Sequence, residues 1–348
     1  MSQKNLGIIG GGQLGSMLSQ AAKKLNIRTT IYSDDIDAPA QNFCDEFICG
    51  EYHNKKKVLE FVSKVDVITY EFENIPYETL NEMNKLKSVL PKPSVNRLIQ
   101  HRIAEKDFIN KLNIRTTRYV SIEKKTDIET LSDFLPGILK TTTMGYDGKG
   151  QYPLKKIEDI NTLSIDFSKE YILEKLVKLK KEISVIVSRF GINNFEIYEP
   201  IENTHQDQIL KHSMIPAEIS KQIADQSKDW ATRIAEELKY IGTLCVEFFI
   251  DRNENLYVNE IAPRVHNSGH LTINAYNVSQ FENHIRAVCS LEKIPLKKIS
   301  NAKMQNLIGK QIEPYRQNLK LSDKEFFFDY QKKEIKEKRK MGHITTLK

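Results

Sequence analysis

Two strand-like segments near residue 250 each carry one carboxylate inside an otherwise apolar run. The first, 244–250, contains Glu247, and the second, 256–261, contains Glu260. Only residues 251–255 separate them, which predicts an antiparallel hairpin. A carboxylate inside an apolar strand is costly unless it is paired or bound to a metal. Two such residues favour a Mg²⁺ site beside phosphates, because Mg²⁺ takes hard oxygen ligands and binds through one or two carboxylates.

Strand alternation predicts which side chains share a face of this hairpin. The expected groups are Cys245, Glu247 and Phe249 on the first strand, and Leu256, Val258 and Glu260 on the second. Whether the two carboxylates point the same way depends on the turn register, which the sequence leaves open. The segment 262–270 follows directly with an arginine and two histidines, and so offers cationic and proton-transfer chemistry beside the metal. The alternative is a charged hairpin leading into a polar loop.

The N-terminal hundred residues have an αβ pattern. Strand-like segments at 6–9, 28–32 and 65–70 alternate with a helix whose apolar residues, from Met17 to Leu25, recur at helical spacing, which predicts a parallel sheet. The turn Gly10-x-Gly12-x-x-Gly15, with Asp34 further on, matches the dinucleotide fingerprint. Such a turn predicts an anion site at a helix N-terminus. NAD(P) and another phosphate fit it equally well, and a purely structural turn is the remaining alternative.

Two further units follow. The unit 114–176 contains strands at 137–140 and 171–175 around the glycine-rich loop 145–151, which is suited to fold over phosphates as a lid. Lys140 precedes this loop as a candidate phosphate ligand, and Glu174 with Lys175 stands where a hinge could contact a base and ribose. The next unit has strands at 182–187 and 195–198, and a helix around 230–238 before the hairpin.

Composition limits the class of protein. The 348 residues allow two or three domains, and the net charge of +6 suits anionic substrates. Because no aromatic-interleaved basic stripe and no long apolar run occurs, we expect neither nucleic-acid binding nor a membrane span. Four cysteines without CxxC spacing read as reduced thiols, with Cys245 in the core. No signal-peptide pattern is found, so we expect a cytoplasmic protein.

Taken in chain order, these motifs resemble the ATP-grasp superfamily and, within it, the N5-carboxyaminoimidazole ribonucleotide synthetase family. The resemblance is carried by the turn 10–15, the loop 145–151, Thr-His-Gln-Asp at 204–207, Asn-Glu-Ile-Ala-Pro-Arg-Val-His-Asn-Ser-Gly-His at 259–270 and Arg-Lys-Met-Gly-His at 339–343. It implies an α/β and α+β enzyme with a Rossmann-like domain at 1–98, an ATP-grasp lid at 99–176, a catalytic ATP-grasp part at 177–292 and a small C-terminal domain at 293–348. Family members usually continue through a terminal helix, so this last domain is expected to be truncated.

The resemblance also implies ligands for each part of the site. ATP would be contacted by Arg97, Lys140, Gly145, Tyr146, Asp147, Gly148, Lys149, Gly150, Gln151, Glu174, Lys175, Leu176, Val177, Glu182, His205, Asn259 and Glu260. Aminoimidazole ribonucleotide and bicarbonate would be contacted by Gly12, Gln13, Leu14, Tyr146, Asp147, Arg264, His266, Asn267, Ser268, Lys333, Arg339 and Lys340. Mg²⁺ would be held by Glu247 and Glu260.

The implied reaction is ATP-dependent carboxylation of 5-aminoimidazole ribonucleotide through carboxyphosphate, in a cytoplasmic homodimer of purine biosynthesis. Arg264, His266 and Asp147 are the expected catalytic residues, and the sequence does not decide which of the last two is the base. An NAD(P)-dependent oxidoreductase is the alternative, but it leaves the loop 145–151 and the paired carboxylates without a role. A phosphate-binding protein without catalysis is the third interpretation.

Overall fold

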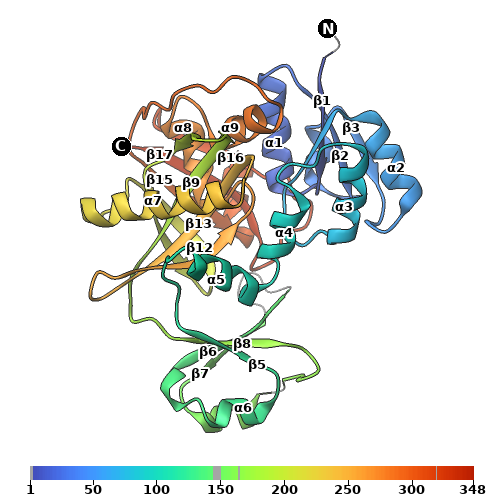
Figure 1. Ribbon diagram of the computed structural model, residues 1–348. Helices are drawn as coiled ribbons and strands as arrows, with labels where there is room; N and C mark the ends of the chain where they lie inside the picture. Colours follow the sequence, from blue (N-terminus) through green and yellow to red (C-terminus); the bar gives the residue numbers. More distant parts are fainter. Residues whose placement is uncertain (1–2, 144–149, 164, 319) are drawn as a thin grey trace.

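The computed structural model describes residues 3–143, 150–163, 165–318 and 320–348. Its N-terminal domain is a parallel sheet of order β3-β2-β1-β4, with helices on its faces, shown in blue in Figure 1. The elements are β1 (Asn5–Ile9), α1 (Gln13–Lys24), β2 (Arg28–Ser33), β3 (Glu46–Cys49), α2 (Lys55–Lys64), β4 (Val67–Tyr70) and α3 (Tyr77–Leu86). The predicted apolar face of α1 is buried from Met17 to Ala22, as its helical spacing requires.

Two helices lead out of this domain into a small antiparallel sheet of order β5-β8-β6-β7. This sheet stands apart at the bottom of Figure 1, joined to the rest by the chain on either side of it. The elements are α4 (Pro93–Ile99), α5 (Arg102–Lys111), β5 (Tyr119–Ile122), α6 (Lys125–Glu129), β6 (Gly137–Thr141), β7 (Gln151–Leu154) and β8 (Tyr171–Lys175). Leu139 and Leu173 belong to its own apolar core, which is separate from that of the large sheet.

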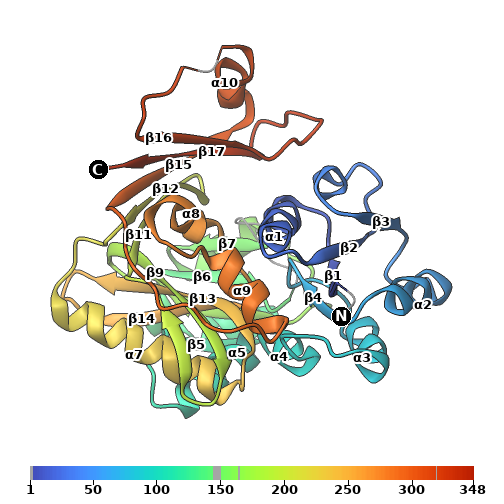
Figure 2. The ribbon, with the colours of Figure 1, turned by 90° about the horizontal axis from the view of Figure 1, so that it is seen from above.

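The large sheet has the order β14-β13-β9-β11-β12-β15-β17-β16, and β10 pairs with β9. Its elements are β9 (Leu179–Gly191), β10 (Asn194–Ile197), β11 (Ile201–Gln206), β12 (Ile209–Ile215), α7 (Lys221–Glu237), β13 (Gly242–Asp251), β14 (Leu256–Ala262), α8 (Thr272–Ala275), α9 (Gln280–Val288), β15 (Ala302–Ile308), α10 (Glu313–Gln317), β16 (Glu325–Asp329) and β17 (Lys340–Leu347). Figure 2 shows the C-terminal strands extending one edge of this sheet. They do so because β15 pairs with β12 through Ala302 to Gln305.

Packing joins the N-terminal domain to the large sheet. Leu14 and Leu18 of α1 share one apolar cluster with Phe281 and Ile285 of α9. The other face of the large sheet is covered by α7, whose Trp230 is tilted against Phe248 at 6.5 Å between ring centroids. In the described part of the chain, no helix has the length and apolar character needed to cross a membrane.

Candidate active site

The two carboxylates of the hairpin lie on the same face of the sheet. Glu247 of β13 is directly paired with Glu260 of β14, whereas the next pair is Phe248 with Val258. Asn259 is therefore the extra residue of a β-bulge, and a bulge re-aims the side chains that follow it. The predicted hairpin is confirmed, and its open register question is answered: the two carboxylates face the same way.

This bulge corrects one expectation about the second strand. Regular alternation predicts that Glu260 shares a face with Leu256 and Val258, but these two residues are buried with Phe248 in the core under α7. The extra residue turns Glu260 to the opposite face. Cys245 is fully buried, as predicted.

Glu247 is held by His266, which follows the hairpin. His266 Nε2 lies 3.0 Å from Glu247 Oε1, while its Nδ1 accepts a hydrogen bond from the Ser268 amide at 3.3 Å. An amide can only donate, so this geometry puts the imidazole proton on Nε2, facing the carboxylate. Burial alone would raise the pKa of Glu247, but His266 lowers it to about 2. Glu247 is therefore a carboxylate anion at neutral pH.

Ser268 continues the network into the sheet. Its Oγ lies 2.8 Å from His266 Nδ1 and 2.8 Å from Ser184 Oγ, and both serines are fully buried. Glu182 lies on the same strand as Ser184, β9, and its Oε2 is 2.7 Å from Nδ1 of His205 on the adjacent β11. Burial opposes a charge on His205, but Glu182 holds its pKa above the ordinary value. The predicted residues Glu182, His205, Glu247, His266 and Ser268 are thus brought into one region.

Glu260 contacts an arginine that sequence reasoning missed. Arg102 Nη1 donates to Glu260 Oε2 at 3.3 Å. The predicted Arg97 instead lies over the ring of Tyr77, 4.7 Å from its centroid. Arg102 is the first residue of α5, and the side chain of the preceding His101 caps that helix by accepting from the Ala104 amide at 3.4 Å. The structure therefore brings Arg102, and not Arg97, to the paired carboxylates.

Lys140 and Glu174 are in contact on adjacent strands of the small sheet, β6 and β8, where they occupy diagonal positions. Lys140 Nζ donates to Glu174 Oε2 at 3.0 Å, and Thr117 Oγ1 donates to the same oxygen at 3.1 Å. A second lysine, Lys106, lies 3.5 Å from Glu174 Oε1 and is 1% exposed. Burial opposes the charge on Glu174, but the two lysines lower its pKa to about 2. Sequence reasoning did not include Lys106.

The strand β8 leads into the predicted hinge. Lys175 Nζ donates to the carbonyl of Asp133 at 2.5 Å, Leu176 is exposed and Val177 is half-buried. In the predicted lid, Gly150 has φ +71°, and Gln151 begins β7. The lid residues Gly145, Tyr146, Asp147, Gly148 and Lys149 lie outside the described residues.

Arg264 joins the large sheet to the N-terminal domain. Its guanidinium forms a bidentate ion pair with Glu73, in which Nε donates to Oε2 and Nη2 donates to Oε1 at 3.0 Å. Burial would lower the pKa of Arg264, but the adjacent Glu73 raises it above its ordinary value. Arg264 is thus a fixed cation with a planar, oriented donor face.

A carboxylate occupies the N-terminal glycine turn. The amides of Gly12 and Gly15 donate to the two oxygens of Glu71 at 2.8 and 3.2 Å. Glu71 is 8% exposed, and burial raises its pKa. The anion site predicted from the GxGxxG pattern therefore exists, but an internal carboxylate fills it. Leu14 is buried in the core beside this turn.

In the C-terminal segment, Lys332 and not the predicted Lys333 lies at the glycine turn 10–15. Lys332 Nζ donates to Gln13 Oε1 at 2.8 Å and to the Lys340 carbonyl at 2.7 Å. Lys333 instead pairs with Asp37, and its side chain is 67% exposed. Arg339 is half-buried, and its Nη1 donates to the Glu334 carbonyl at 3.3 Å.

Asn267 lies deeper, where the polar segment meets the C-terminal strands. It exchanges side-chain hydrogen bonds with Asn306 of β15, at 3.2 and 2.6 Å, and is 7% exposed. Tyr330 joins this pair, since Asn267 Nδ2 donates to its hydroxyl at 3.4 Å. Asn267 therefore anchors the segment to the rest of the large sheet.

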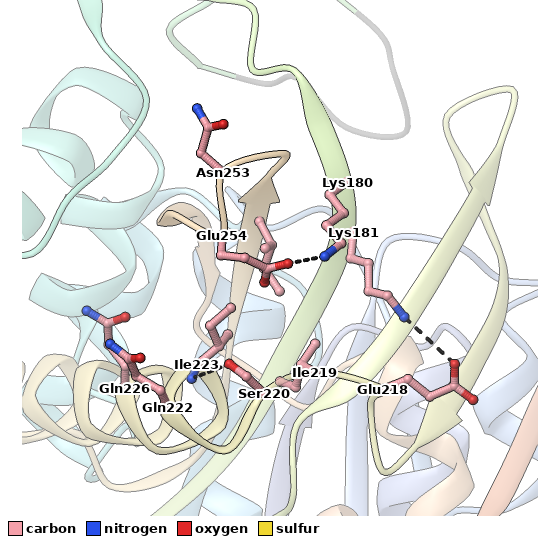
Figure 3. A pocket seen from close by; sticks show the side chains of 11 residues that line it. Lys180, Lys181, Glu218, Ile219, Ser220, Gln222, Ile223, Gln226, Asn253 and Glu254 are labelled. Atoms are coloured by element: carbon pink, nitrogen blue, oxygen red, sulfur yellow. Dashed lines mark hydrogen bonds and ion pairs between the residues drawn. The ribbon is translucent and has the colours of Figure 1, made fainter.

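A cavity of ≈ 620 Å³ opens elsewhere, between β9, the hairpin tip and the start of α7 (Figure 3). Ile223 and Ile250 line it and belong to the core under α7, on the face opposite Glu247. Lys180 and Lys181 at its rim are paired with Glu254 and Glu202. We therefore place the site at the paired carboxylates and not at this cavity. Within the described residues, no three His, Cys, Asp or Glu side chains gather as a ready-made metal cluster.

Three sequence profiles match this chain in order. The ribonucleotide synthetase preATP-grasp domain matches residues 3–100, the ATP-grasp domain matches 107–281, and the phosphoribosylaminoimidazole carboxylase C-terminal domain matches 302–348. Together with the fold and the paired carboxylates, these matches define an ATP-grasp ligase, and the predicted fold class is confirmed. The individual domain limits proposed from the sequence remain predictions.

Relatives that match nearly the whole chain identify the family within the ATP-grasp ligases. N5-carboxyaminoimidazole ribonucleotide synthases from Staphylococcus aureus (strain COL) and Brucella melitensis are 37% and 39% identical to the chain, covering 98% and 99% of it and 92% and 96% of those proteins. A crystal structure of the S. aureus synthetase with ADP superposes with a TM-score of 0.93 at 36% identity, covering 99% of this chain and 93% of that one. An Aspergillus clavatus synthase in complex with ADP and 5-aminoimidazole ribonucleotide superposes at 0.90 with 26% identity, covering 99% and 94%. The chain belongs to the N5-carboxyaminoimidazole ribonucleotide synthase family.

Proposed function

We propose that the chain carboxylates 5-aminoimidazole ribonucleotide with bicarbonate, converting ATP to ADP and phosphate and giving N5-carboxyaminoimidazole ribonucleotide for purine biosynthesis. The observation that carries this proposal is the pairing of Glu247 with Glu260 on one face, followed directly by Arg264 and His266, in a chain of this family. The oxidoreductase alternative loses its support, because Glu71 already accepts the amide hydrogen bonds that a pyrophosphate would need.

ATP binding is supported by the cationic groups between the small and the large sheet. Lys140 is a buried amine on β6, which precedes the loop 145–151 in the sequence, and Arg102 reaches Glu260 from α5. We propose that Arg102 takes the place assigned to Arg97 from the sequence. Phosphoryl transfer to bicarbonate is mostly positioning and charge neutralisation, which fixed cations supply without reorganising. The carboxyphosphate formed hydrolyses in water, so a closing lid over the site has a direct chemical purpose.

Glu247 and Glu260 fit a Mg²⁺ ion. Both are on one face of the sheet, and Glu247 is held as an anion. The Glu260 side chain is 42% exposed, so it remains accessible to a ligand. Mg²⁺ held there would neutralise charge on the ATP phosphates. In this proposal His266 and Arg102 orient the two carboxylates.

The ribonucleotide side of the site is supported by the groups that join the domains. Arg264 presents its bidentate face toward Glu73, and Lys332 stands at the glycine turn. We propose that Arg264 stabilises the charge that develops on the carboxylate and phosphate during transfer. Asp147 and His266 are the two candidates for the base that accepts the amine proton; His266 would act through Nδ1, after exchanging the Ser268 amide for the substrate amine as hydrogen-bond donor.

The direct test is ADP release by the purified protein. We expect ADP to form at a rate that depends on both bicarbonate and 5-aminoimidazole ribonucleotide, with the carboxylated product detected by mass. A rate of ATP hydrolysis that does not depend on the ribonucleotide would contradict the proposed function. The homodimer and the cytoplasmic location are also proposals; light scattering of the eluted protein at twice the chain mass of 40.3 kDa would support the first.

A further inference from the structure

Helix α5 contacts the bulge in β14 at three consecutive residues. Lys106 Nζ donates to the Asn259 carbonyl at 3.4 Å, Arg102 contacts the Glu260 side chain, and Glu105 Oε1 accepts from the Ile261 amide at 2.6 Å. Residues 102, 105 and 106 lie on one face of a helix, because positions three and four apart are neighbours there. One face of α5 therefore contacts both Asn259, the extra residue of the bulge, and Glu260, the carboxylate that the bulge turns to the other face.

The strand β14 needs such support because it is an edge of the large sheet. Among the described residues, no named strand pairs with its outer edge, so its outward amides need other acceptors. The Val258 amide donates to the Arg115 carbonyl at 2.8 Å, and the Ile261 amide donates to Glu105. A regular strand spaces its outward amides by two residues, but these are three apart, which is the spacing that a one-residue bulge creates. Glu105 thus accepts an amide that the bulged register turns outward.

Glu105 suits this role because it is fixed and shielded. It is 2% exposed and lies one helical turn before Ile109, which is fully buried in the core under α7. If the bulge were lost, regular alternation would point Glu260 with Val258 toward that core. We propose that Glu105 is a positioning residue that holds the β14 bulge and so keeps Glu260 on the face of Glu247, where the proposed function needs both carboxylates for Mg²⁺.

The test compares three variants. Glu105→Met keeps the length of the side chain but cannot accept the Ile261 amide, whereas Glu105→Gln keeps an acceptor. Ile109→Ala is the matched control, since it weakens the apolar packing of the same helix and leaves the hydrogen bond from the Ile261 amide to Glu105 in place. We expect the affinity for Mn²⁺ in the presence of ADP, followed by electron paramagnetic resonance, to fall at least 10-fold in Glu105→Met. It should stay within about twofold of wild type in the other two variants.

Hydrogen exchange at the Ile261 amide provides a readout that does not depend on the reaction. Exchange should accelerate in Glu105→Met and remain slow in Glu105→Gln. Wild-type Mn²⁺ affinity and exchange in Glu105→Met, or an equal loss of affinity in Ile109→Ala, would overturn the inference. If Glu105→Met does not fold, Glu105→Asp, whose shorter side chain withdraws the acceptor, takes its place under the same criteria. A wild-type protein that forms no ADP with the ribonucleotide would instead contradict the proposed function and leave the exchange result standing.

Discussion

Arg264 and Glu73 form a bidentate ion pair between the segment that follows β14 and the segment that follows β4. The pair is mostly buried, with side-chain exposures of 17% and 27%. Removing one member of such a pair leaves an uncompensated charge, so the pair joins the two domains as well as orienting the arginine. Arg264 therefore has a structural partner in addition to its proposed catalytic role.

Substitution of Arg264 by lysine separates these roles, because lysine keeps the charge and loses the fork. If Arg264 stabilises the transition state, kcat should fall by roughly 10²-fold or more while the KM for ATP changes little. Steady-state kinetics and the melting temperature should be measured on one preparation.

Glu73→Gln is the comparison for this variant, since it removes the partner's charge and leaves Arg264 in place. A purely structural pair predicts that both variants lower the melting temperature while kcat of the folded fraction stays near wild type. That pattern would remove Arg264 from the catalytic residues.

Glu260→Gln should abolish turnover, because it removes one of the two carboxylates proposed to hold Mg²⁺. The amide still accepts from Arg102, so the fold should be retained and the melting temperature should change little. ADP formation is measured against Mg²⁺ concentration. Wild-type rates at saturating Mg²⁺ would end the metal assignment.

The glycine turn gives a prediction about dinucleotides. Since Glu71 accepts from Gly12 and Gly15, we expect no specific NAD(P)H binding in a fluorescence titration. Glu71→Ala leaves two amides without their acceptor and should destabilise the protein by about 2 kcal/mol. A micromolar Kd for either dinucleotide with the wild-type protein would revive the oxidoreductase alternative.

The sequence predicted those parts of the site that lie on regular elements or in contiguous motifs. The N-terminal parallel sheet, the helix after the glycine turn and the carboxylate hairpin all follow from periodicity. The direction of Glu260 did not, because a bulge is a tertiary feature: β14 is held at Asn259 and Ile261 by a helix about 150 residues earlier.

The residues that the sequence did not predict were missed for a different reason. Glu71, Glu73, Arg102 and Lys106 stand in no motif, and each acts through a partner far along the chain. One signal was available: Glu71 and Glu73 directly follow a buried parallel strand, at the edge where ligand sites form. Lys333 was assigned from the family resemblance, and it lies in an irregular segment, where a shift of one residue changes which side chain points inward.

Acid should destabilise the protein partly through His284. Its Nδ1 accepts from the Thr243 amide at 3.0 Å, and its Nε2 lies 2.7 Å from Thr69 Oγ1 in the N-terminal domain. Burial lowers its pKa from 6.5 to about 4. Below pH 6.5, His284 binds a proton in the unfolded chain but stays neutral in the folded protein. Its contribution to the free energy of unfolding is therefore fully present above pH 6.5 and is lost as the pH falls toward 4.

The expected loss from this one residue is about 2 kcal/mol at pH 5. Urea unfolding at pH 7.5 and pH 5 should show a smaller decrease for His284→Gln than for wild type, whatever the variant's stability at pH 7.5. Equal decreases in the two proteins would show that His284 is not a source of acid sensitivity.

Lys332 and Lys333 form a matched pair for testing the ribonucleotide site. Lys332 lies inside, between Gln13 and the Lys340 carbonyl, and its charge acts on the buried Glu71. Lys333 points to Asp37 at the exposed surface. A substrate phosphate near the glycine turn needs a cation there, because Glu71 already accepts the amide hydrogen bonds.

We therefore expect Lys332→Ala to raise the KM for 5-aminoimidazole ribonucleotide by roughly 10-fold or more, with the KM for ATP nearly unchanged. Lys333→Ala should leave both constants within about twofold of wild type, since an exposed ion pair contributes little. The two substitutions remove the same charge from adjacent positions, so a difference between them reflects position and not net charge. If Lys333→Ala raises the KM for the ribonucleotide and Lys332→Ala does not, the assignment made from the sequence is right and the one made from the structure is wrong.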